Sequence, residues 1–148
     1  MESARKESLS PQPRDIHELT IRARNVTLEI VEASEGKIKI KSNCTGQVNG
    51  SLYSGSYNDT VEAVMNPDGT LAVTIRYLHI TQKGEPVWGA GGGKRGVPGS
   101  NGMARLNAEG VMWTSSPRLL QLNGKRWIVE GVYNVKEESI EVMRQILS

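Results

Sequence analysis

A histidine and a tyrosine that share one face of a predicted strand carry the clearest chemical signal in this sequence. Tyr77 and His79 lie two residues apart in 71–81, where apolar and polar residues alternate. If this segment is extended, both side chains leave the sheet on the same side. Together they could act as general acid and base, or hydrogen-bond a ligand carbonyl. The alternative is a histidine that only completes a hydrogen bond at a strand end.

Charged residues on neighbouring segments are further candidates. Arg76 lies on the opposite face from Tyr77, and Glu62 lies across a predicted turn from it. Anion binding by Arg76 therefore competes with a simple cross-strand ion pair. Glu130 alternates with apolar residues, and a buried carboxylate there would need a cationic partner or would have a raised pKa.

The stretch from Gly84 to Gly102 holds eight of the sixteen glycines. Its composition predicts a long loop, with Trp88 at its start and two basic residues at its tip. We expect residues 89–102 to form a lid over a pocket, the alternative being a plain connection. A phosphate-binding loop is not indicated, because Arg95 occupies the position where the Walker pattern needs Ser or Thr.

Segment 103–114 offers two faces with different compositions. One face carries Arg105 and Trp113 among polar residues, and it could line a polar cavity with the indole as its floor. The other face is apolar and built from small residues, which would leave volume inside a barrel. The composition favours the interpretation that the first face is exposed to solvent.

Strand-like segments follow one another from Glu18, with turn signals between them and no βαβ alternation. The clearest turn is 66–69, Asn-Pro-Asp-Gly, in which proline presets φ and glycine accepts a positive φ. Between Ala23 and Val26 the apolar phase switches, which predicts a β-bulge or a barrel corner. Segment 135–147 fits either a helix or a strand, and closure of the sheet favours the strand.

These patterns predict an all-β protein with a single antiparallel up-and-down β-barrel of about eight to nine strands. The barrel domain is expected over residues 16–148, after a disordered N-terminal tail over residues 1–15. The interior of an eight-stranded barrel is just wide enough to be filled by side chains or to hold one small ligand.

Composition excludes several classes of function. A formal net charge of +2 over 148 residues does not indicate nucleic-acid binding. Cys44 is the one cysteine, so no intrachain disulfide can form, and we expect a buried, inert thiol. His17 and His79 have no carboxylate at ligand spacing, so neither a metal nor a cofactor is expected. With no signal peptide or long apolar run, we expect a cytoplasmic protein without membrane contact.

Three motifs carry a resemblance to a known family. They are the Pro67-Asp68-Gly69-Thr70 hairpin, the Arg76-Tyr77 strand, and the closing hairpin of Leu122-Asn123-Gly124 with Glu130-Gly131. Over residues 18–147 the chain resembles small prokaryotic calycin-type (lipocalin-like) β-barrel proteins of unknown function. The Gly-x-Trp opening of lipocalins has no counterpart, because the first tryptophan is Trp88. The resemblance therefore implies a fold and assigns no functional residue.

Three functions remain open. The first is binding of a small hydrophobic molecule inside the barrel, and its expected site residues are Tyr53, Tyr57, Tyr77, His79, Trp88, Arg105 and Trp113. The second is a cofactor-independent isomerase or cyclase that uses His79 or Glu130 as base, with Arg76 or Arg105 stabilising developing negative charge. The third is a filled barrel whose outer strands pair into a homodimer.

Overall fold

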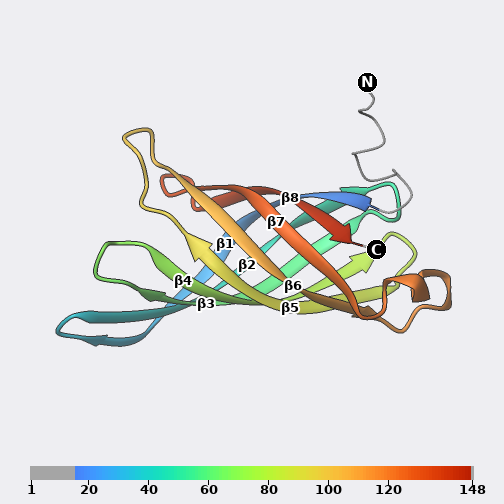
Figure 1. Ribbon diagram of the computed structural model, residues 1–148, viewed down its shortest axis with the longest axis horizontal. Coiled ribbons are helices and arrows are strands. Elements are labelled where there is room, and N and C mark those ends of the chain that lie inside the picture. The colour runs from blue at the N-terminus through green and yellow to red at the C-terminus, as the bar shows by residue number, and fades with distance from the viewer. Residues whose placement is uncertain (1–15, 148) are drawn as a thin grey trace, which may run out of the picture.

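Alternation of apolar and polar residues produces a closed antiparallel barrel in the computed structural model, which describes residues 16–147. Each strand pairs with the next along the chain, and the last pairs with the first (Figure 1). The strands are β1 (Ile16–Ser34), β2 (Lys37–Gly50), β3 (Gly55–Met65), β4 (Leu71–Thr81), β5 (Pro86–Arg95), β6 (Met103–Thr114), β7 (Lys125–Asn134) and β8 (Ser139–Leu147). The predicted all-β, up-and-down barrel is confirmed. The tail expected over residues 1–15 lies outside the described residues.

The last strand closes the barrel. β8 pairs with β1 from Ile16 opposite Leu147 to Arg24 opposite Ser139. The prediction of a final strand over a helix is therefore correct. Along these residues closure pairs the edge of β1 with the edge of β8, which is the physical reason for preferring the strand.

β1 is bent where the sequence predicts a change of phase. Its register against β2 shifts between Asn25 and Thr27, and again between Ile30 and Glu32. Beyond the first shift the β1–β2 hairpin projects past the neighbouring turn (Figure 1), and the side chains of Val26 and Leu28 become exposed. The predicted β-bulge is confirmed.

The glycine-rich segment is a strand, so the predicted lid over 89–102 is wrong. β5 pairs with β4 and with β6 along its length, and the connection to β6 covers only residues 96–102. A Cβ on Gly89 would lie 2.6 Å from Cζ of Tyr77, and one on Gly91 would lie 2.7 Å from the Trp127 ring. The close approach of two large rings therefore requires these glycines.

A short 3-10 helix, η3 (Pro117–Leu122), lies between β6 and β7. Leu119 and Leu122 of this helix are buried and belong to the core. Within residues 16–147, no helix is long and apolar enough to cross a membrane.

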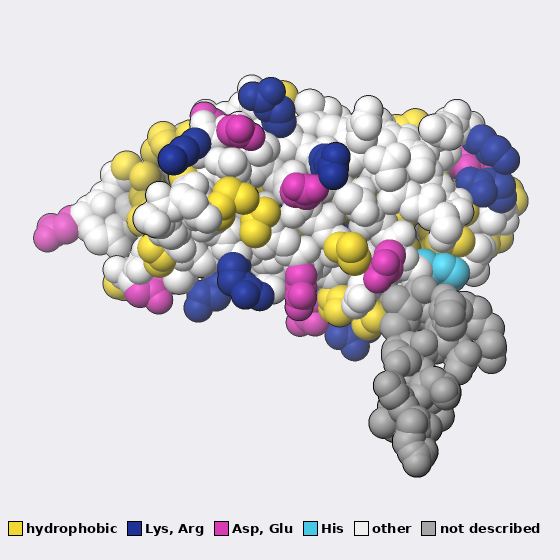
Figure 2. Space-filling view, turned by 90° about the horizontal axis from the view of Figure 1, so that it is seen from above, with side chains coloured by type: hydrophobic (Ala, Val, Ile, Leu, Met, Phe, Trp, Pro, Cys, Tyr) yellow, Lys and Arg dark blue, Asp and Glu magenta, His cyan; other side chains and the backbone are white. Residues whose placement is uncertain are grey.

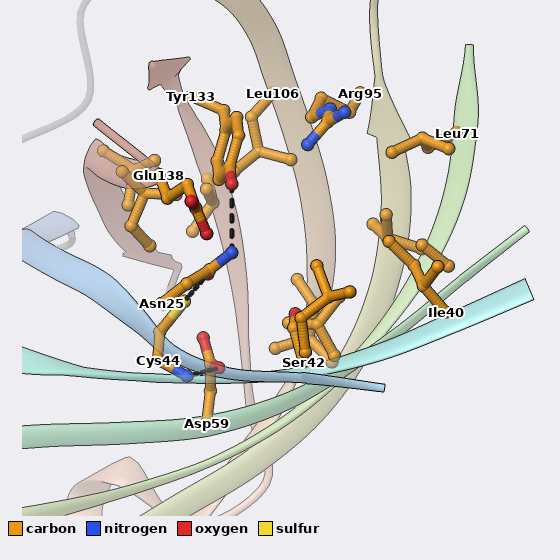
Figure 3. A pocket seen from close by; sticks show the side chains of 18 of the residues that line it. Asn25, Ile40, Ser42, Cys44, Asp59, Leu71, Arg95, Leu106, Tyr133 and Glu138 are labelled. Carbon is orange, nitrogen blue, oxygen red and sulfur yellow. Dashed lines mark hydrogen bonds between the residues drawn. The ribbon is translucent and has the colours of Figure 1, made fainter. Parts of the chain in front are cut away.

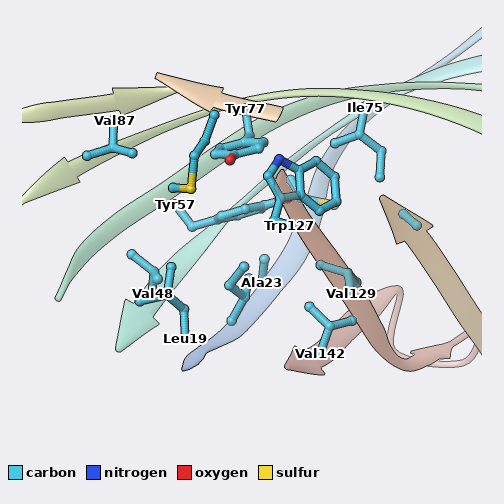
Figure 4. Packing of buried hydrophobic residues seen from close by; sticks show 14 of the residues in the cluster. Leu19, Ala23, Val48, Tyr57, Ile75, Tyr77, Val87, Trp127, Val129 and Val142 are labelled. Carbon is cyan, nitrogen blue, oxygen red and sulfur yellow. The ribbon is translucent and has the colours of Figure 1, made fainter. Parts of the chain in front are cut away.

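The barrel interior divides into two halves of different filling. In the half next to η3, which we call the filled half, Leu19, Val48, His79, Met112 and Trp127 are completely buried. Figure 4 shows the rings of this region packed against the aliphatic side chains of β1 and β2. In the opposite half, which we call the hollow half, the inward side chains are mostly aliphatic and leave a cavity open between them.

Candidate functional site

The cavity of the hollow half has a volume of about 490 Å³, which lies in the range of small-molecule sites. Its wall is largely aliphatic, with a few polar and aromatic side chains such as Tyr133 among the branched ones (Figure 3). Representative wall residues are Ile40, Val61, Leu71, Val73, Leu106 and Ile140. An apolar molecule entering this space would exchange water for contacts with hydrocarbon.

A chain of hydrogen bonds fixes one side of the cavity (Figure 3). Nδ2 of Asn25 donates to the Tyr133 hydroxyl over 3.0 Å, and Sγ of Cys44 donates to Oδ1 of Asn25 over 2.8 Å. Burial and the neighbouring Asp59 raise the pKa of the Cys44 thiol to about 12, so the thiol stays protonated. The expectation of a buried, unreactive cysteine agrees with this geometry.

Asp59 is a buried carboxyl group on the cavity floor. It accepts hydrogen bonds from the Tyr57 hydroxyl over 2.6 Å and from the backbone N–H of Cys44 over 3.0 Å. Burial raises the pKa of Asp59, although these hydrogen bonds and the charge of Arg144 act in the opposite direction. The floor thus combines a desolvated carboxyl group with a nearby cation.

Arg144 of β8 lines the same cavity and is only 2% exposed. Its guanidinium carbon lies 3.9 Å from the ring centre of Tyr77 and 4.3 Å from that of Trp127. Among residues 16–147, its Nε and Nη1 atoms have no hydrogen-bond partner. A buried cation is therefore held by aromatic faces, with donors left over.

Arg95, nearer the open end, repeats this arrangement in a less buried setting. Its guanidinium carbon lies 4.4 Å from the ring centre of Tyr133, and its buried Nε has no partner in the described part of the chain. Two arginines therefore line one apolar cavity. Such a site could hold an apolar molecule with a polar or anionic group. Across the described strands, no three His, Cys, Asp or Glu side chains are grouped so that they could hold a metal ion.

The four aromatic residues predicted for the barrel wall are all buried inside it. His79 has its Nδ1 2.6 Å from the Tyr53 hydroxyl, and its ring centre lies 4.7 Å from that of Tyr77. Burial holds the pKa of His79 well below its usual range, so the ring is neutral. Tyr53 and His79 lie in the filled half and do not line the cavity, whereas Tyr57 does. The alternative of a hydrogen-bonded histidine therefore describes His79.

The remaining predicted site residues lie on the outer face, away from the cavity. Trp88 and Trp113 are cross-strand partners there, 39% and 38% exposed. Arg105 and Glu130 also face solvent, because the neighbouring positions of their strands carry the inward side chains. None of these four residues lines the cavity, so the structure does not place Arg105 or Trp113 in its wall, Trp88 over it or Glu130 inside it as a base.

Arg76 is also on the outer surface. Its Nη2 lies 3.3 Å from Oε2 of Glu62, so the structure shows the cross-strand ion pair and not an inward anion site. Figure 2 shows one face on which cations and anions are interspersed with apolar side chains. Pairs of this kind contribute little to stability because water screens them.

Sequence reasoning missed the two charged residues that reach the floor. Asp59 follows Tyr57 in the inward phase of β3, and Arg144 lies between Val142 and Ile146 in the inward phase of β8. A charge at an inward position of a strand was the available signal. In β8 this signal depends on the segment being a strand, because a helix would turn a different set of residues inward.

No protein-family model matches this chain, and a search of curated proteins finds no match. Solved structures do share its fold. A conserved protein of unknown function from Rhodopseudomonas palustris is 14% identical, with a TM-score of 0.74 over 94% of this chain and 100% of that one. A β-barrel-like protein from Acinetobacter baumannii is 15% identical, with a TM-score of 0.74 over 95% and 99%.

An enzyme from Penicillium herquei is also similar, at 19% identity and a TM-score of 0.61 over 93% of this chain and 99% of that one. At these identities the likeness shows the fold alone. The chain is a small β-barrel protein similar in fold to proteins of unknown function.

Proposed function

We propose that this protein binds a small, largely apolar molecule in the hollow half of its barrel. The observation that carries the proposal is the cavity of about 490 Å³ inside a barrel whose other half is tightly filled. A structural barrel of this size can be packed throughout. Here the packing ends halfway, and the remaining space has an aliphatic wall.

The chemistry of the wall supports an apolar body for the ligand. Burial of apolar surface contributes roughly 25 cal/mol per Å² removed from water. A few polar groups, among them Asn25, Asp59 and Tyr133, face the same space and would orient the bound molecule. The site therefore favours a ligand with a hydrocarbon body and a small number of polar atoms.

A fluorescence titration with Nile red, a neutral apolar dye, tests the proposal. We expect an emission increase on adding wild-type protein, and its reversal by decan-1-ol. Val61→Trp places an indole in the cavity and should abolish the dye signal. Leu78→Trp adds the same group to the exposed face and serves as the control, so it should leave the signal unchanged. Equal dye binding by both variants would contradict an interior site.

A second candidate is an enzyme that moves a proton within the bound molecule. Asp59 favours it, because its buried carboxyl group lies on the cavity floor with Arg144 near enough to affect its pKa. Asp59 would take a proton from carbon and return it to another carbon, with Arg144 stabilising the intermediate enolate. Its base differs from the two expected from sequence, since His79 and Glu130 do not line the cavity.

Solvent deuterium exchange separates the enzyme from a pure binder. Carbonyl compounds that bind the wild-type protein would be incubated with it in deuterated water and followed by NMR. An enzyme incorporates deuterium at carbon, and Asp59→Asn stops the exchange while binding continues. Binding without exchange in the wild type would rule out this second candidate.

A further inference from the structure

We propose that Arg144 anchors a carboxylate, so that the molecule bound in the hollow half is an apolar monocarboxylate. This inference rests on the proposed binding function and names the chemical class of its ligand. It begins from a single anomaly, a cation in the interior of the barrel without an ion pair in the described chain.

Burial of Arg144 has a cost that its two aromatic contacts offset only in part. Removing a charge from water is unfavourable by several kcal/mol unless it gains partners. The residue is 2% exposed, yet none of the described carboxylates lies within ion-pair distance of it, and Nε and Nη1 lack hydrogen-bond partners. A hydrophobic side chain at this position would remove that cost, so the retained cation points to a partner that arrives from outside.

Aromatic packing holds the guanidinium in a fixed place. The Tyr77 and Trp127 rings lie 3.9 Å and 4.3 Å from its central carbon, measured to the ring centres. Those rings are themselves fixed against Gly89 and Gly91, where any larger residue would clash. Stacking contacts use the faces of the guanidinium and leave N–H groups at its edge free to donate. A carboxylate accepts such donors, often two at once.

Two carboxyl groups face the same cavity and must be considered with any anionic ligand. Glu138 lines the wall beside the β7–β8 turn and is exposed, so water screens its charge. Asp59 is on the floor, where the Tyr57 hydroxyl and the Cys44 N–H occupy its oxygens. Burial raises the pKa of Asp59, and the positive charge of Arg144 acts to lower it. Arg95 adds a further positive charge to the wall.

The shape of the site explains why a carboxylate with an apolar body fits better than a free inorganic anion. Arg144 lines the aliphatic cavity, with Val129 opposite it on β7 and Val142 two residues before it on β8. A small hydrated anion would lose its water without gaining apolar contacts. A hydrocarbon chain or ring ending in a carboxylate fills the cavity and pairs the cation at the same time.

Isothermal titration of wild-type protein with decanoate and with decan-1-ol tests the inference, because the two probes share one hydrocarbon chain. We expect decanoate to bind at least about tenfold more tightly, the effect of one charge-assisted hydrogen bond. Arg144→Met should remove this preference and keep the affinity for decan-1-ol. Arg126→Met changes an exposed arginine on the outer face and should leave both affinities unchanged.

Different outcomes separate this inference from the proposed function. Equal affinity of the wild type for both probes would overturn the carboxylate site and leave apolar binding intact. Absence of binding by either probe would overturn both. The assignment would also be overturned if Arg95→Met loses the preference for decanoate while Arg144→Met keeps it. That result would place the carboxylate at Arg95.

A measurement on wild-type protein covers the case in which Arg144→Met fails to fold. In protein labelled with ¹⁵N-arginine, the Nε–H resonance of Arg144 should shift on addition of decanoate and stay in place with decan-1-ol. A shift of the Arg95 resonance alone would contradict the proposal.

Discussion

The filled and hollow halves of the barrel are built from the same eight strands, and they differ in the size and polarity of the inward side chains. Towards η3, the strands carry Tyr57, Tyr77 and Trp127, whose rings lie close together (Figure 4). Towards the open end, the same strands carry valine, alanine and leucine. The alternation sets the fold in both halves, and side-chain volume decides whether a half supplies stability or space.

Glycines of β5 contribute to the difference between the filled half and the hollow half. Two inward glycines of β5, Gly89 and Gly91, lie against the Tyr77 and Trp127 rings, so the barrel wall is thinnest where the side chains are largest. Without them the filled half could not hold both Tyr77 and Trp127. Arg144 and Asp59 lie at the boundary between the halves, where packed rings meet the cavity.

The largest expected effect comes from emptying the filled half. Trp127→Ala removes a completely buried ring and should lower the free energy of unfolding by about 3–5 kcal/mol. Leu106→Ala enlarges a space that already exists, and its cost should stay near 1 kcal/mol. Urea unfolding of both variants measures the contrast. Similar losses at the two sites would show that the halves are equally packed.

The next largest loss of stability is expected for a glycine substitution in β5, the strand that the sequence predicts as part of a lid. Gly91→Ala pushes a methyl group against the backbone oxygen of Glu109 and the Trp127 ring, and should lower the free energy of unfolding by about 1–3 kcal/mol. Gly96→Ala, in the β5–β6 connection, meets no atom closer than 3.8 Å and should change it by less than about 0.5 kcal/mol. Thermal unfolding compares the pair. A neutral Gly91→Ala would contradict the close approach of the ring.

We expect Asp59 to lower the free energy of unfolding of the protein as pH rises. Its folded pKa is raised above the ordinary value of 3.8, so the folded state binds the proton more tightly than the unfolded chain. The stability deficit of the wild type relative to Asp59→Asn should therefore grow as pH increases above 3.8, then level off once the folded group ionises. Urea unfolding at several pH values tests this. A difference independent of pH would contradict a raised pKa.

Glu85, at the opposite end of the barrel, should show the smallest effect and the opposite sign. Nη2 of Arg118 lies 2.6 Å from Oε1 of Glu85, and the Ser116 hydroxyl donates a hydrogen bond to the same carboxylate. These contacts lower the pKa of Glu85 from 4.5 to about 2. Its stabilisation is complete above pH 4.5 and is lost as pH falls towards 2. Glu85→Gln should flatten that part of the stability profile. An unchanged acid profile would show that the ion pair is not formed in solution.

The fold was predictable from sequence because it depends on alternation, which a single chain displays. The phase change in β1, the 66–69 turn and the inward face of β4 all follow from it, and each is confirmed. Gly69 of that turn has φ of +89°, as the turn requires. Local chemistry was enough for these features.

The candidate site was less predictable, because it depends on what lies across the barrel. The glycines of β5 read as a loop until Tyr77 and Trp127 are known to lie against them. His79 looked like a base at an open end, yet its end of β4 is the filled one. Which end stays hollow follows from side chains summed over eight strands, a quantity that no single segment reveals.

Intermolecular NOEs between decan-1-ol and the methyl groups of the protein test the central claim most directly. The structure predicts cross-peaks to Val61, Leu106 and Ile140, which line the cavity, and none to Leu19, Val48 or Ile146 in the filled half. Cross-peaks confined to outer-face residues such as Leu78, or shared equally between the halves, would contradict a barrel that is hollow at one end only.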